Sequence, residues 1–82
     1  MYTYKTKGTC SSQINFNITE DNLVTDVEFI GGCNGNLQAI SRLVDGKTPE
    51  EVVFLLKGIN CGFKKTSCGD QLARALEPFI KD

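Results

Sequence analysis

The stretch INFNITEDNLVTDVEF, residues 14–29, decides the fold of this chain. It holds two runs in which alternate side chains are apolar or β-branched, the pattern of a strand with one buried face. The positions that share a face are Ile14, Phe16 and Ile18 in the first run and Leu23, Thr25, Val27 and Phe29 in the second. Glu20, Asp21 and Asn22 lie between the runs and are typical of a turn. The stretch therefore predicts two antiparallel strands joined by a tight connection.

A third alternating run precedes this hairpin, and a helical pattern follows it. Tyr2 and Tyr4 alternate with polar residues near the N-terminus, which predicts another strand. The apolar positions of a first predicted helix are Leu37, Ile40, Leu43 and Val44. Gly46 follows them and is a typical helix stop.

Two further helices have clear start signals. Thr48 is a good capping residue, Pro49 suits the first helical position, and Glu51 completes a capping box. Ser67 is expected to begin the last helix. The apolar stripe of that helix is Leu72, Ala73, Leu76, Phe79 and Ile80. Pro78 removes a backbone donor near its end, so we expect a kink or fraying there.

The predicted order is three strands followed by three helices. It indicates an α+β fold, a three-stranded antiparallel sheet followed by three helices packed on one face. No repeat or linker interrupts residues 1–82, so we expect a single domain. A chain of this length buries only a thin core, and such domains often gain stability from a metal ion or from cross-links.

The overall composition predicts a cytoplasmic protein that binds neither nucleic acid nor membrane. The 82 residues carry a net charge of −1 and are 40% hydrophobic, which is ordinary for a globular domain. A near-neutral chain has no strong electrostatic attraction to nucleic acid or anionic lipid. The N-terminus lacks the apolar segment of a signal peptide, and no apolar run is long enough to cross a bilayer. In the cytoplasm thiols stay reduced.

The most unusual feature of the composition is its four cysteines with no histidine. They are Cys10, Cys33, Cys61 and Cys68, and no two form a CxxC pair. Cys10 and Cys33 are equidistant from the predicted turn, so a regular antiparallel register places them opposite each other. Cys33 precedes one predicted helix and Cys68 begins another, where free amides and the helix dipole favour a thiolate. With Cys61 from the neighbouring loop, the four thiolates match a closed tetrahedral zinc site.

The residues alone leave further roles open for the cysteines. Cysteine is among the most buried residue types, but glycine and polar residues flank Cys33 and Cys68, which fits inert burial poorly. Structural disulfides are disfavoured in a reducing compartment. Thiol redox chemistry would use Cys61 and Cys68 as the exchanging pair, and a tetrathiolate site also accepts an iron–sulfur cluster. Without histidine or a carboxylate pair, the chain is not expected to catalyse a reaction alone.

The segment Thr66–Asp70 (TSCGD) resembles the naming motif of the TSCPD domain family, Thr-Ser-Cys-Pro-Asp, with Gly69 in place of the proline. Segments 31–36 and 58–62 are also similar to that family, and the whole chain resembles its short, free-standing four-cysteine branch. The resemblance implies a relation to the C-terminal accessory region of adenosylcobalamin-dependent ribonucleoside-diphosphate reductases. It does not imply reductase activity, because a chain of this length has no room for the catalytic barrel.

The arrangement of cysteines and helices is also similar to the NifU-type iron–sulfur scaffold. The three cysteines of that scaffold would correspond to Cys10, Cys33 and Cys68. Its aspartate after the first cysteine and its histidine before the last are replaced by serines here, and Cys61 is additional. A fourth thiolate closes the coordination sphere, which favours retaining a metal over handing it on.

We therefore predict a small cytoplasmic module that holds Zn²⁺ through Cys10, Cys33, Cys61 and Cys68. The alternatives are an iron–sulfur scaffold or carrier and a thiol redox protein that serves a reductase. A module without an active site of its own acts through a protein partner, and the family resemblance suggests a ribonucleotide reductase as that partner. The sequence leaves a homodimer open.

Overall fold

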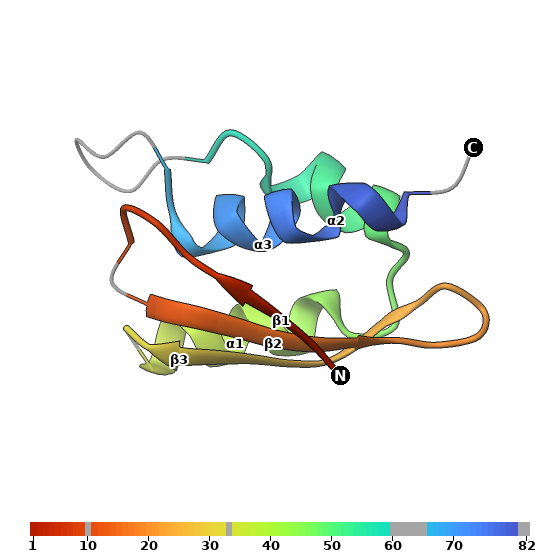
Figure 1. Cartoon of the computed structure of the whole chain (residues 1–82), viewed down its shortest axis with the longest axis horizontal. Helices are drawn as coiled ribbons and strands as arrows, with labels where there is room; N and C mark the ends of the chain where they lie inside the picture. Colours follow the sequence, from red (N-terminus) through yellow and green to blue (C-terminus); the bar gives the residue numbers. More distant parts are fainter. Residues whose placement is uncertain (10, 33, 60–65, 81–82) are drawn as a thin grey trace.

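The computed structural model describes residues 1–9, 11–32, 34–59 and 66–80. The strands are β1 (Tyr2–Lys5), β2 (Ser11–Ile18) and β3 (Val24–Gly31). The helices are α1 (Asn34–Val44), α2 (Pro49–Leu56) and α3 (Cys68–Leu76), followed by a short 3₁₀ segment, η1 (Glu77–Phe79). This order and the antiparallel sheet confirm the predicted α+β class. Figure 1 shows α2 and α3 lying over the sheet and α1 beside β3.

The sheet has one apolar and one polar face, with β2 as its central strand. Ile14 and Phe16 are buried on the apolar face, as the alternation predicts. On the opposite, exposed face the Thr3 hydroxyl donates to Asn15 Oδ1 at 3.0 Å, and Asn15 Nδ2 donates to Glu28 Oε1 at 3.2 Å. The apolar face is therefore the one on which the core forms.

A bulge in β3 makes part of the predicted alternation wrong. The Cα partners on its two sides are Asn15↔Glu28 and Asn17↔Thr25, so β3 takes three steps where β2 takes two. Asp26 lies in this extra length and has a φ of 54°. A bulge changes the face of the side chains beyond it. Val24 is consequently fully buried, where the alternation predicts Leu23 and Thr25 on the core face.

Helix α1 packs beside β3, and the connection after it is bonded to the start of that strand. Val44 is buried as predicted, but Leu43 is 71% exposed, so its place in the predicted apolar stripe is wrong. Leu43 lies about 100° around the helix from Val44 and therefore points away from the sheet. After the helix, the Gly46 N–H donates to Val24 O and the Val24 N–H donates to Lys47 O, both at 2.7 Å. These bonds fix the connection between α1 and α2 against the first residue of β3.

The predicted starts of α2 and α3 are confirmed. Thr48 Oγ1 accepts the Glu51 N–H at 3.2 Å, and Glu51 Oε1 accepts the Thr48 N–H at 3.0 Å, which completes the capping box. Ser67 caps α3, because its Oγ accepts the Asp70 N–H at 3.1 Å. Helix α3 ends at Leu76, shortly before Pro78 in η1, so the break expected at this proline is present. Phe79 and Ile80, which the sequence placed in the apolar stripe of this helix, therefore lie beyond its end.

All three helices contribute to one core on the apolar face of the sheet, as predicted. Its buried members are Ile14, Phe16, Val24, Val44, Val52, Leu72, Ala75 and Leu76. Helix α3 is the central element, because eight of its nine residues are buried. At one end of the core the rings of Tyr2, Phe16 and Phe79 contact one another, with centroids 4.7 to 5.7 Å apart. No helix within the described ranges is long and apolar enough to cross a membrane.

Candidate functional site

One of the four predicted metal ligands lies among the described residues. Cys68 is the first residue of α3 and is buried, in agreement with its predicted position at a helix start. Cys10, Cys33 and Cys61 lie outside the described residues, so their part in a shared site stays a prediction. Among the residues that the structure describes, no three side chains of His, Cys, Asp or Glu come together in a group that would hold a metal ion.

The residue next to Cys10 contacts Cys68. Ser11 Oγ lies 3.1 Å from Cys68 Sγ, and both side chains are buried. Ser11 is also the Cα partner of Gly31, which precedes Cys33 by two residues. In Figure 1 the start of β2, the end of β3 and the start of α3 lie at the same end of the molecule. Three described segments that contain or border a predicted ligand therefore meet at this end of the molecule.

A register shift between Ser11 and Gln13 turns Ser11 toward the core. Regular alternation from Ile14 would bury Ser12, but Ser12 is exposed and Ser11 is buried. Sequence reasoning missed Ser11 for this reason, since no residue pattern in the strand indicates the irregularity. The symmetric register that underlies the predicted pairing of two cysteines across the hairpin is thus interrupted close to them.

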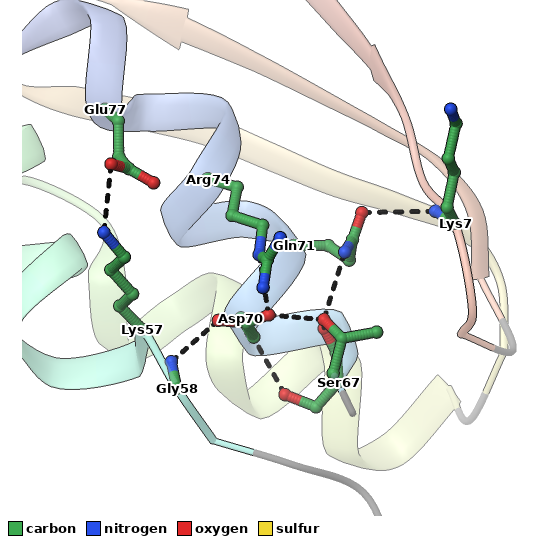
Figure 2. A network of polar contacts seen from close by, with 9 residues as sticks. Lys7, Lys57, Gly58, Ser67, Asp70, Gln71, Arg74 and Glu77 are labelled. Atoms are coloured by element: carbon green, nitrogen blue, oxygen red, sulfur yellow. Dashed lines mark hydrogen bonds and ion pairs between the residues drawn. The ribbon is translucent and has the colours of Figure 1, made fainter. Parts of the chain in front are cut away.

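Asp70 is the centre of a buried polar network in the first turn of α3, drawn in Figure 2. Its side chain is 1% exposed. Oδ1 accepts the Gly58 N–H at 2.7 Å, and Oδ2 accepts the Thr66 hydroxyl and, at 2.9 Å, Arg74 Nε. Gly58 and Thr66 lie on the two sides of segment 60–65. A single carboxylate thus holds the chain both before and after that segment.

Gln71 extends the network to the connection between β1 and β2. Its Nε2 donates to Thr66 Oγ1 at 3.0 Å, and its Oε1 accepts the Lys7 N–H at 3.1 Å. A Cβ placed on Gly8 would lie 3.3 Å from Thr66 Cγ2, so this connection packs directly on the TSCGD motif. Sequence reasoning missed Gln71. The only sequence signal for Gln71 is that this polar residue lies four positions before Ala75, on the apolar side of α3.

The hydrogen bonds keep Asp70 ionised. Burial raises the pKa of Asp70, but the hydrogen bonds from the Thr66 hydroxyl, the Gly58 N–H and the Arg74 side chain outweigh it. The pKa of Asp70 therefore lies below its ordinary value of 3.8. Asp70 is therefore negatively charged in the folded structure at neutral pH.

This lowered pKa predicts a loss of stability in acid. Because the pKa of Asp70 is lower in the folded than in the unfolded chain, the ionised carboxylate stabilises the fold above about pH 4. That contribution is lost as the pH falls through the folded pKa. We expect the difference in free energy of unfolding between wild type and Asp70→Asn to be constant near neutral pH and to shrink below about pH 4. Urea unfolding with a chelator present, repeated across this pH range, measures it. A difference that grows in acid would contradict the prediction.

Gly69, which stands in place of the motif proline, offers a stabilising substitution. It lies in the first turn of α3, and a Cβ added there would be 3.5 Å from Leu56 Cδ2, an ordinary van der Waals contact. We expect Gly69→Ala to raise the free energy of unfolding by about 0.5–1 kcal/mol, because glycine costs that much in a helix. Urea unfolding measures the change. The control Gly58→Ala should instead destabilise, since Gly58 has a φ of 87°. Equal effects at the two glycines would contradict this account.

Comparison with protein families agrees with the motif. The family model described as the TSCPD domain matches residues 2–80, nearly the whole chain. No curated protein and no solved structure gives a significant match. The family match confirms the resemblance seen at Thr66–Asp70 and extends it over all three strands and all three helices. The chain belongs to the TSCPD domain family.

Proposed function

We propose that this domain binds Zn²⁺ through the thiolates of Cys10, Cys33, Cys61 and Cys68 and works as a metal-stabilised binding module. The observation that supports this best is the 3.1 Å contact between Ser11 Oγ and Cys68 Sγ. Through this contact, the residue that borders the first cysteine lies at the start of α3, beside the last one.

The other two proposed ligands are close along the chain to residues fixed at the same end of the domain. Cys33 follows Gly31, the partner of Ser11, by two residues, and Cys61 follows Gly58 by three. An extended chain spans at most about 3.6 Å per residue, so these cysteines are at most about 7 and 11 Å from the two anchoring Cα atoms. These short separations along the chain support a shared site for the four sulfurs.

The set of donors fits a structural zinc site. Zn²⁺ in such sites takes four tetrahedral ligands, and four cysteine thiolates are one of the usual combinations. A closed site leaves no position for a reacting water, which is consistent with stabilisation rather than catalysis. Zinc contributes an apparent ~10–16 kcal/mol to folding in zinc-finger peptides. Among the described residues, eight form the buried core cluster, and domains with so small a core often gain stability from a metal ion.

Elemental analysis of the anaerobically purified chain, combined with thiol titration, tests the proposal. We expect about one zinc ion per chain and four thiols protected from alkylation until a chelator is added. Chelation should lower the midpoint of thermal unfolding, and added zinc should restore it. The variant Cys68→Ser should lose zinc, whereas Ser12→Ala, an exposed serine on β2, should keep it.

Different results would replace this function with one of its alternatives. Iron and inorganic sulfide with visible absorbance would favour the iron–sulfur scaffold or carrier. Thiols that disappear on mild oxidation of a metal-free chain would favour the redox protein. A metal-free chain whose unfolding midpoint does not respond to zinc would contradict metal binding.

We extend the proposal to a protein partner, with a ribonucleotide reductase as the first candidate because of the family relation. Phe54 on α2 is 85% exposed, and Leu43 on α1 is also exposed, so the surface offers apolar side chains for a contact. We expect calorimetry with a purified adenosylcobalamin-dependent reductase to show binding that Phe54→Ala weakens. A reductase that does not bind the wild-type domain would contradict the partner and leave the metal site unaffected.

A further inference from the structure

Ser11 is held firmly beside Cys68. It is the first residue of β2 and is 3% exposed. Its carbonyl oxygen accepts hydrogen bonds from the hydroxyls of Thr6 and Thr9, the latter at 3.0 Å. Its Cα is paired with Gly31 on β3. The backbone at Ser11 is thus fixed from two sides, which sets the position of its hydroxyl 3.1 Å from Cys68 Sγ.

The charge state of Cys68 decides which atom donates the hydrogen bond between Ser11 Oγ and Cys68 Sγ. A hydroxyl has one proton to donate, and a thiolate has none. Thr9 donates its proton to the carbonyl of Ser11, so the Ser11 proton has two acceptors within reach, Cys68 Sγ at 3.1 Å and Thr9 Oγ1 at 3.3 Å. When Cys68 is a thiolate, its sulfur only accepts and Ser11 is the donor. Hydrogen bonds to an ionised partner are roughly twice as strong as neutral ones, so the contact strengthens when Cys68 is deprotonated.

We propose that Ser11 is a positioning residue of the metal site. Its hydroxyl donates a hydrogen bond to the metal-bound thiolate of Cys68, fixes the direction of that sulfur and increases the affinity for the ion. This inference rests on the proposed function. Ser11 does not bind the metal itself and acts only through Cys68, as hydrogen-bond partners of metal ligands do.

The neighbouring serines provide a matched pair of variants in the full chain. Ser12 is exposed, and its hydroxyl donates to Ile30 O at 3.3 Å on the outer side of the hairpin. Zn²⁺ affinity is measured by competition with a chromophoric chelator, and Co²⁺ serves as a spectroscopic probe of the thiolates. We expect Ser11→Ala to bind Zn²⁺ about 10-fold more weakly. Its sulfur-to-cobalt charge-transfer bands should move to lower energy, since the thiolate loses a donor. Ser12→Ala should leave both unchanged.

A third variant separates positioning from a general loss of stability. Val52→Ala opens the core on α2 and should lower the free energy of unfolding without moving the Co²⁺ bands. Unchanged affinity and unchanged bands in Ser11→Ala would overturn the inference and leave the proposed function standing. Equal band shifts in Ser11→Ala and Val52→Ala would also overturn it.

A wild-type chain that binds neither ion would overturn the proposed function and, with it, the role of Ser11. If Ser11→Ala does not fold, Ser11→Thr decides, because it keeps the hydroxyl. Bands at the wild-type position in that variant support the inference, and shifted bands overturn it.

Discussion

Replacing Asp70 by alanine should lower the free energy of unfolding by about 2–3 kcal/mol, because two partly buried donors lose their acceptor. These donors are the Gly58 N–H and the Thr66 hydroxyl. Arg74, the third partner, is 52% exposed and returns to water, so its loss adds little. Urea unfolding at neutral pH with a chelator present measures the change without a contribution from metal binding.

Two controls identify the cause of this loss. Asp70→Asn keeps one carbonyl oxygen as an acceptor and should lose less stability than Asp70→Ala. Glu77→Gln removes the exposed ion pair with Lys57, whose atoms are 3.1 Å apart, and should change the free energy of unfolding by less than about 1 kcal/mol. If Asp70→Ala were as stable as Glu77→Gln, the carboxylate would not be holding the chain around segment 60–65.

Replacing Phe16 by alanine should cost about 3–5 kcal/mol, the usual range for a buried phenylalanine. Phe16 is buried on β2, and its ring lies 5.6 Å from the Tyr2 ring and 5.7 Å from the Phe79 ring. Its removal therefore loosens β1 and η1 as well as the centre of the sheet. Urea unfolding gives the free energy, and a loss of ring-dependent near-ultraviolet circular dichroism reports the loosened contacts.

The same substitution on the surface is the control. Phe54→Ala removes a ring of equal size that is 85% exposed, and it should change stability by no more than about 0.5 kcal/mol. Comparable losses at Phe16 and Phe54 would mean that the Phe16 ring contributes no burial of its own, which contradicts the described core.

The parts of the fold that depend on neighbouring residues are predictable from the sequence. The capping box at Thr48 and Glu51 requires only a short segment, and the alternation around Ile14 requires only one strand. The bulge at Asp26 is different, because it depends on how two strands pair along their length. The bulge at Asp26, whose φ is positive, places Val24 in the core, contrary to the predicted alternation.

The candidate site likewise has features that local sequence predicts and features that depend on distant contacts. The motif and the position of Cys68 at a helix start follow from local signals, and the structure bears them out. The carboxylate of Asp70 accepts a hydrogen bond from Gly58, beyond the end of α2, and the proposed role of Ser11 depends on a contact with a residue 57 positions away. Such pairings arise only when the chain is folded, so no local pattern indicates them.

The central position of α3 has a consequence for synthesis of the protein. This helix fills the middle of the core, yet it leaves the ribosome after all the strands and the other two helices. Translation adds about 5–20 residues per second, so the stretch of about 20 residues from the end of α2 to the end of α3 takes about one to four seconds. During that interval the sheet presents Ile14 and Phe16 without the α3 side chains that later cover them. A ribosome that stalls in this stretch would therefore hold a nascent chain prone to aggregation and dependent on chaperones.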